Sequence, residues 1–332
     1  MHELYPWCQS HWQSIMTAKS IERMPHAILL YGPKGIGKYT FTDHLVNNLL
    51  CDSPGENKLA CGVCSSCVLF KANTHPDHLR VSIPDEKKVI SIEQTREIYH
   101  HLMLKAKKSA FKTVTILAAD KMTISAANSL LKILEEPPRN TVITLISTSL
   151  FALPVTIRSR CQKFQFSIHK REAEKWLAQQ LLSINSKQED INLMYLLNLV
   201  GGAPLRALSY LEQDLLSQRI KLAHNLFSFK ENINPLKTVE DYILKIWEEA
   251  LYWMILFTMD MIRIKRNVST ELLINTDIED YLREFSRKVE LKPLFSLLEK
   301  IEYSLWLLTN RTQINTQLLL EKLLIDWFLL LA

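Results

Sequence analysis

Glycine is scarce in this sequence of 332 residues, which contains seven glycines. Five of them fall in two short regions, at positions 32, 35, 37, 55 and 62. The chain has no low-complexity tract and no glycine–serine linker, and 47% of its residues are hydrophobic, which excludes a disordered chain. We therefore expect folded domains, two or three of them at roughly 100–200 residues each.

Long apolar runs are also missing. The most apolar segment, residues 250–259, is about half as long as the roughly 20 residues that a membrane-spanning helix needs. The N-terminal residues lack a basic stretch followed by an apolar one, so the sequence shows no secretion signal. We expect a cytoplasmic protein with no membrane partner, in which residues 250–259 form a buried helix.

Neither sign of charge dominates. The chain has 40 Lys and Arg against 35 Asp and Glu, a net charge of +5. This mild excess permits contact with nucleic acid or with an acidic partner and demonstrates neither. There are six cysteines, and in a reducing compartment clustered cysteines indicate a metal site rather than disulfides.

Three apolar segments, at residues 26–31, 113–119 and 141–147, are predicted to be buried strands. Helical patterns separate them, which indicates a parallel sheet with helices on both faces. Residues 125–136 have the spacing of an amphipathic helix, and two prolines end it. No strand pattern follows residue 166. We predict an α/β domain at 1–166, a small helical domain at 167–207 and an all-α domain at 208–332.

A glycine-rich loop follows the first predicted strand. Gly32, Gly37 and Lys38 have the G-x-x-x-x-G-K spacing of a phosphate-binding loop, with Gly35 between them, and a helix is predicted to follow. In such a loop, glycines let backbone N–H groups approach phosphates, and the helix N-terminus favours their negative charge. The pattern predicts a nucleotide-binding fold.

The loop lacks two features that hydrolysis requires. Tyr39 stands where a Ser or Thr hydroxyl would hold the magnesium ion. The predicted strand at 113–119 ends in Leu117, Ala118 and Ala119, without the carboxylates that hold magnesium and polarise water. We predict that the chain does not hydrolyse ATP efficiently, and whether it binds ATP stays open.

Four cysteines follow the loop helix at the spacing C-x9-C-x2-C-x2-C, namely Cys51, Cys61, Cys64 and Cys67. Four thiolates suit tetrahedral zinc, and a closed shell of four ligands leaves no position for water, which indicates a structural role. An iron–sulfur cluster is the alternative. Two nearby histidines, His75 and His78, are expected to be polar loop residues rather than ligands.

These motifs together resemble the clamp-loader branch of the AAA+ family. The resemblance covers about the first 210 residues. It rests on the segment around the loop (24–38), the four-cysteine insertion, "ADKMTISAANSLLKILEEPPRNT" (119–141), Ser159-Arg160-Cys161 and "GGAPLRAL" (201–208).

The resemblance implies an AAA+ domain with a zinc module at 51–67, a helical lid and a C-terminal collar that oligomerises. It implies an accessory subunit of a DNA polymerase holoenzyme, not itself catalytic, in a hetero-oligomer with tau/gamma and delta subunits. Such a complex loads the sliding clamp (beta) onto primed DNA. Ser159 and Arg160 would supply an arginine finger to ATP bound by a neighbouring tau/gamma subunit. In active relatives, an arginine after the small domain contacts the nucleotide; here Leu205 stands at that position and Arg206 follows it.

Two other functions compete with this interpretation. An ATP-hydrolysing motor subunit of the tau/gamma type would need Ser or Thr after Lys38 and acids at the strand end. A free-standing zinc-dependent nucleic-acid-binding module would have no use for an arginine finger. The basic segments 104–112 and 262–266 are either contacts to DNA phosphates or ordinary solvated surface.

Overall fold

The computed structural model describes residues 4–55, 59–85, 87–184, 192–227, 239, 243–310 and 314–330. By its internal contacts the chain divides into two compact units. One comprises Met1–Leu193 with Val200–Arg206, and the other comprises Met194–Leu199 with Ala207–Ala332. The predicted division into three domains, at 1–166, 167–207 and 208–332, stays a prediction.

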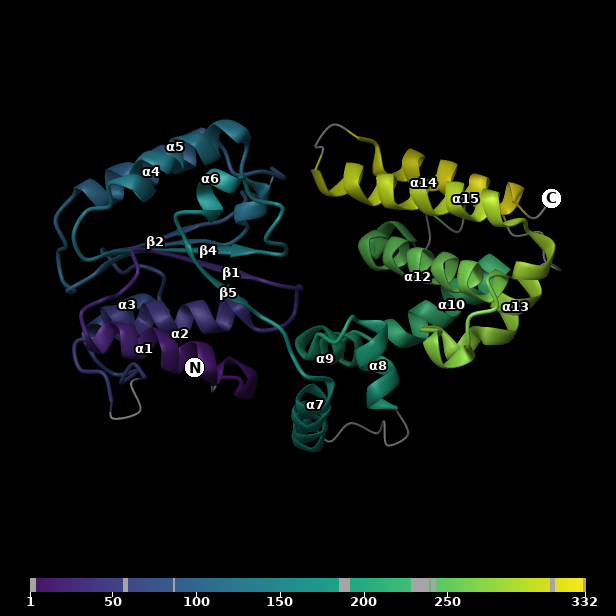
Figure 1. Cartoon of the computed structure of the whole chain (residues 1–332), viewed down its shortest axis with the longest axis horizontal. Helices are drawn as coiled ribbons and strands as arrows, with labels where there is room; N and C mark the ends of the chain where they lie inside the picture. The colour runs from purple at the N-terminus through teal and green to yellow at the C-terminus, as the bar shows by residue number, and fades with distance from the viewer. Residues whose placement is uncertain are drawn as a thin grey trace. The chain divides into compact units, whose positions relative to one another are not determined.

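A five-stranded parallel sheet forms the centre of the first unit (Figure 1). Its order is β2-β3-β4-β1-β5, and each pair of neighbouring strands is parallel. The strands are β1 (Ala27–Tyr31), β2 (His78–Val81), β3 (Lys112–Ile116), β4 (Thr141–Ser147) and β5 (Gln162–Gln165). The three strands predicted from apolar runs are confirmed, although β3 ends at Ile116 rather than at residue 119, where a 3-10 turn (Ala119–Lys121) begins. The two outermost strands, β2 and β5, were not predicted.

Helices cover both faces of this sheet (Figure 1). On one face lie α1 (Gln9–Ser20), α2 (Lys38–Leu50) and α3 (Ser65–Lys71); on the other lie α4 (Ile92–Met103), α5 (Ile124–Glu135) and α6 (Val155–Arg158). The alternation along β1 explains both layers, because successive side chains of a strand point to opposite faces. Ile28 and Leu30 pack with α1 and α2, whereas Leu29 packs with α4 and α5.

Eight further α-helices lie in the part of the chain that the structure describes. They are α7 (Lys170–Ile184), α8 (Leu193–Leu199), α9 (Pro204–Glu212), α10 (Leu215–Phe227), α12 (Trp247–Lys265), α13 (Glu279–Lys288), α14 (Leu291–Asn310) and α15 (Thr316–Leu329). The apolar run at 250–259 lies in α12, where Leu251, Trp253 and Phe257 are fully buried. Among the described residues, no helix has both the length and the apolar character needed to cross a membrane.

A buried ionic network holds part of the second unit together. Arg219 of α10 is fully buried, and its guanidinium lies 2.5 Å from the Asp277 carboxylate and donates to Asn275 Oδ1 at 2.5 Å. Asp260 of α12, also fully buried, accepts from the backbone N–H of Asn275 at 2.8 Å. The buried charges therefore have partners, as they must in an apolar interior.

In the first unit, Asp77 anchors the basic segment that leads into β3. Its buried carboxylate accepts hydrogen bonds from the backbone N–H groups of Lys107 (2.7 Å), Lys108 (2.7 Å) and Ser109 (2.9 Å). Burial raises the pKa of Asp77, but the three donors outweigh it and hold the pKa below its ordinary value. The ionised carboxylate thus fixes the backbone between α4 and β3.

We expect Asp77→Ala to lower the free energy of unfolding by about 3 kcal/mol, because three backbone N–H groups lose a charged acceptor. A depressed pKa means that this stabilisation is full above the unfolded value of about 4 and is lost as the pH falls through the folded pKa. Denaturant titrations of both proteins between pH 3 and 7 measure the difference, which should shrink at the acid end. The control is Asp85→Ala, at an exposed position. Equal unfolding midpoints for the two variants at pH 7 would contradict the anchoring role.

Candidate functional site

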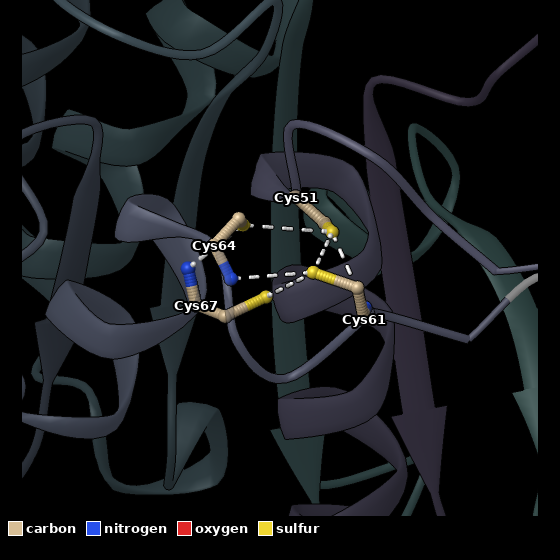
Figure 2. Close-up of side chains that lie close together, drawn as sticks. All are labelled: Cys51, Cys61, Cys64 and Cys67. Atoms are coloured by element: carbon tan, nitrogen blue, oxygen red, sulfur yellow. Dashed lines mark hydrogen bonds between the residues drawn. The ribbon is translucent and has the colours of Figure 1, made fainter.

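The four cysteines of the predicted metal site converge on one point (Figure 2). Cys51 follows α2, Cys61 and Cys64 lie in the next loop, and Cys67 lies in α3. Their four Sγ atoms all lie within 4.8 Å of one another. The Cys51 sulfur is 3.6 Å from that of Cys61 and 3.8 Å from that of Cys64, and the Cys61 and Cys67 sulfurs are 3.9 Å apart.

These separations fit a metal ion and exclude disulfides as they stand. Four sulfurs about 2.3 Å from a tetrahedral zinc ion lie about 3.8 Å from each other, whereas a disulfide bond is about 2.05 Å long. Backbone N–H groups point at the sulfurs: Cys61 donates to Cys51 Sγ at 3.3 Å, and Cys64 donates to Cys61 Sγ at 3.4 Å. Such donors stabilise thiolates, the form that binds metal. The four residues can therefore hold one metal ion, and zinc suits them.

His75 lies in the loop before β2, as expected, whereas His78 lies within β2, so the expectation of a loop residue was wrong for His78. His75 is buried, with its Nε2 3.3 Å from the hydroxyl of Ser109, which donates to Leu50 O at 2.9 Å. His78 lies on β2, with its Nδ1 3.0 Å from Thr113 Oγ1. Burial lowers the pKa of His78 to about 3. Both histidines lie in the polar packing between the cysteine module and the sheet, and among the described residues the metal-competent group comprises the cysteines alone.

The glycine-rich loop has the predicted place, between β1 and α2. Gly32, Gly35 and Gly37 all have positive φ, at 146°, 77° and 88°, a conformation that favours glycine. Lys38 begins α2 and is buried, but its ammonium turns back on the loop. It donates to the carbonyl oxygens of Gly32 at 2.5 Å and Pro33 at 2.6 Å. Burial lowers the pKa of Lys38 to about 8, although the charge of Asp120 opposes this.

Residues from outside the loop pack tightly against it. A Cβ atom on Gly37 would lie 2.5 Å from the ring of Tyr5, and one on Gly35 would lie 2.9 Å from the Cβ of Arg206. Trp7 Nε1 donates to Ile36 O at 2.9 Å, and the backbone N–H of Leu205 donates to Gly35 O at 3.1 Å. The rings of Tyr5 and Trp7 stack 5.1 Å apart, and Trp176 of α7 meets both edge-on. The sequence motif of the glycine-rich loop did not predict these aromatic neighbours.

The Tyr39 hydroxyl forms a hydrogen bond within the protein. It donates to the backbone oxygen of Leu117 at 3.0 Å, just beyond the end of β3. Asp120 lies in the 3-10 turn that follows, and it accepts a hydrogen bond from Thr148 Oγ1 at 2.7 Å. The position where a magnesium-binding hydroxyl is expected thus holds a phenol bonded to a main-chain carbonyl.

Ser159 and Arg160 lie at the opposite edge of the sheet from the loop. They follow α6 and precede β5, which runs parallel to β1 with Gln162 opposite Ile28. The loop follows the other end of β1, five residues on, a distance of roughly 16 Å at about 3.3 Å per residue. The Arg160 side chain is 35% exposed and Ser159 is exposed. The predicted loop residues therefore lie together, and the four cysteines form a separate group. Arg160 lies apart from the loop.

The fold and the loop define the class of the molecule. A parallel sheet in which β1 leads through a glycine-rich loop into α2, followed by helical segments, is an AAA+ P-loop fold. Two family descriptions match the chain: "DNA polymerase III, delta subunit" at residues 8–170, and "DNA polymerase III, delta subunit, C terminal" at residues 213–328.

Individual relatives cover almost the whole chain. DNA polymerase III subunit delta' of Pseudomonas aeruginosa is 30% identical over 329 residues, 98% of each chain. The subunit delta' of Escherichia coli K12 is 27% identical over 322 residues, 97% of this chain and 94% of the relative. A solved gamma-subunit-related protein of Thermotoga maritima is 19% identical, with a TM-score of 0.46, covering 96% of this chain and 99% of its own. The chain belongs to the delta-prime (delta') family of DNA polymerase III clamp-loader subunits.

We expect the purified chain to hold one equivalent of metal and Cys64→Ser to hold none. Cys64 is also the N-cap of α3, where its Sγ accepts from the Cys67 N–H, and serine keeps that cap. Loss of metal should lower the melting temperature by at least about 5 °C, because each kcal/mol of lost stability lowers it by about 2–4 °C in a domain of this size. Elemental analysis and thermal unfolding measure both effects.

The control is the neighbouring Ser65→Ala, which leaves the four sulfurs in place and should retain the metal. A full equivalent of metal in Cys64→Ser, or an unchanged melting temperature after verified metal removal, would count against the site.

Proposed function

We propose that this chain is an accessory clamp-loader subunit that does not hydrolyse ATP and provides Arg160 to ATP bound by a neighbouring tau/gamma subunit. Its partners would be tau/gamma and delta subunits, and the complex would load the sliding clamp (beta) onto primed DNA in the cytoplasm. Similarity to delta' subunits along almost the whole chain supports this assignment. The observation that carries it is the separation of Arg160 from the chain's own phosphate-binding loop.

The placement of Arg160 favours action on another chain's nucleotide. The loop and Arg160 lie at opposite edges of the sheet, roughly 16 Å apart along β1, so Arg160 is far from a nucleotide bound at its own loop. Its side chain is partly exposed in the segment between the four-residue helix α6 and β5, where a second chain can approach it. An arginine so supplied stabilises the charge that develops on the γ-phosphate. Ser159 would assist, since its hydroxyl lies 3.4 Å from Arg160 Nη1.

The contacts of the loop favour a site without hydrolysis. A lysine that binds phosphate must release its two loop carbonyls first, and Lys38 holds both at short distance. Tyr39 cannot hold magnesium while its hydroxyl is bonded to Leu117 O, and no acid stands at Leu117 or Ala118. ATP binding without hydrolysis remains compatible with the retained Gly32, Gly37 and Lys38.

A structural zinc ion completes the proposal. The four sulfurs form a closed tetrahedral set, so the ion would have no open position for water and would take no part in the chemistry. It would join the end of α2 to the short helix α3. The buried cluster there comprises Val46, Leu50 and Phe70.

The main test replaces the arginine. We expect Arg160→Ala to lower ATP turnover at the neighbouring tau/gamma site by roughly 10³-fold, because a finger supplied by a second chain is worth at least that much. Assembly with tau/gamma and delta should persist, since the side chain is partly exposed. Gel filtration of the complex, its steady-state ATPase with clamp and primed DNA, and single-turnover hydrolysis measure these outcomes.

The matched control is Arg158→Ala. Arg158 lies two residues earlier, with its guanidinium 5.2 Å from the ring of Phe151, and it should leave turnover close to that of the unaltered complex. Normal clamp loading and ATPase in Arg160→Ala would refute the finger assignment.

The competing function, an ATP-hydrolysing motor of the tau/gamma type, is tested on the chain by itself. We expect no steady-state ATP hydrolysis above background with magnesium and primed DNA, because Lys38 and Tyr39 are both bonded to backbone carbonyls. The comparison is Lys38→Ala, which should behave identically. Turnover that Lys38→Ala abolishes would show that other groups hold magnesium, and the motor function would then replace the proposed one.

A further inference from the structure

The Arg160 guanidinium is held by a carboxylate from another helix. Its Nη2 lies 2.6 Å from Glu135 Oε1, and the side chains are 35% and 49% exposed, respectively. Glu135 is the last residue of α5, and α5 and α6 lie on the same face of the sheet (Figure 1). The sequence placed Glu135 in a predicted amphipathic helix and in a family signature, and it predicted no role for the Glu135 side chain.

The other contacts of Arg160 are local. Its Nη1 donates to Thr156 O at 2.9 Å and to the Ser159 hydroxyl at 3.4 Å, both within the same short turn. Among the described residues, Glu135 is therefore the partner that ties the guanidinium to a separate element. A side chain with as many rotatable bonds as arginine needs such a tie to hold one direction.

The location of Glu135 is not explained by the stability of its own helix. A carboxylate in the last turn of a helix faces the negative end of the helix dipole, which disfavours it. The helix is nevertheless rigidly placed, because Leu130, Ile133 and Leu134 are buried in the core of the first unit. In addition, Leu134 O lies 3.1 Å from His26 Nε2, which fixes this end of α5 beside the start of β1. The well-packed helix α5 thus holds the Glu135 carboxylate in place, although the carboxylate does not stabilise that helix.

We propose that Glu135 is a positioning residue for Arg160, holding the guanidinium ready for the phosphate of the neighbouring subunit. The inference rests on the proposed arginine-finger function. Of the five N–H groups of a guanidinium, Nη1 uses two on Thr156 and Ser159, and Nη2 faces Glu135. The Nε–H and the second Nη2–H have no partner among the described residues. Phosphate oxygens can therefore bind Arg160 while Glu135 keeps its place.

The test compares Glu135→Gln with the unaltered chain in the assembled complex. Glutamine keeps the size and removes the charge, so we expect the kcat for ATP hydrolysis to fall about two- to fivefold, in keeping with the weak energies of exposed ion pairs. The KM for ATP and the yield of complex should not change, because Glu135 does not touch the nucleotide. The matched control is Glu136→Gln, which changes the adjacent exposed acid and should leave kcat unaltered.

A double variant shows whether Glu135 acts through Arg160. Adding Glu135→Gln to Arg160→Ala should lower kcat no further than Arg160→Ala does, because non-additive effects reveal a shared interaction. An unchanged or raised kcat in Glu135→Gln, or additive losses in the double variant, would overturn the positioning role. If Arg160→Ala itself leaves the ATPase normal, the finger assignment fails first, and that result is distinguishable from failure of Glu135 alone.

Discussion

The parallel pairing of β1 between β4 and β5 is the constraint on which the arrangement of the first unit depends. Because all five strands run the same way, their carboxyl ends lie at one edge of the sheet and their amino ends at the other. The glycine-rich loop, Leu117 and Thr148 follow strands and so share the carboxyl edge. Arg160 precedes β5, and Glu135 precedes β4, so both lie at the amino edge. Strand direction alone thus separates the phosphate-binding loop from the arginine.

The polar groups at the two edges of the sheet differ in how far they are already bonded within the protein. At the carboxyl edge, polar groups that could bind a nucleotide and magnesium are bonded to the protein itself: Lys38 to two loop carbonyls, Tyr39 to Leu117 O, and Asp120 to Thr148. At the amino edge, a charged guanidinium is partly exposed and keeps N–H groups for an external acceptor. The contacts of the buried Lys38 are costly to break, whereas an exposed ion pair exchanges partners readily. The groups that could bind this chain's own nucleotide are therefore bonded within the protein. Arg160, in contrast, keeps N–H groups for an acceptor on another chain.

The sequence predicted those features that depend on local pattern. The strands β1 and β4 follow from continuous apolar runs, because strands buried on both faces need no polar alternation. The strands β2 and β5 escaped prediction because they lie at the sheet edges, where polar residues such as Arg80 and Lys163 are tolerated. The convergence of the four cysteines could be predicted from their spacing, since three of them lie within seven residues.

Contacts between distant segments could not be predicted in this way. The bond from Tyr39 to Leu117 joins residues 78 positions apart, and nothing near Tyr39 in sequence specifies it. His78 was taken for a loop residue because the segment around it is polar, yet it lies in β2 with its Nδ1 3.0 Å from Thr113 Oγ1, and His75 in the preceding loop is buried. The pair of Glu135 and Arg160 likewise depends on how α5 and α6 pack.

The separation of the two edges also explains how a chain of this fold can lose one activity and keep the other. Substituting Tyr for a magnesium-binding hydroxyl changes contacts around β1, β3 and the loop, all at the carboxyl edge. The packing that presents Arg160 depends instead on Leu130, Ile133 and Ile157 beneath α5 and α6, on one face of the sheet. Because distant sites without shared partners respond independently, the proposed loss of hydrolysis at the loop would carry no energetic penalty for the packing that presents Arg160. In the proposed assembly, a subunit with a degenerate loop therefore remains fully able to act on its neighbour's ATP.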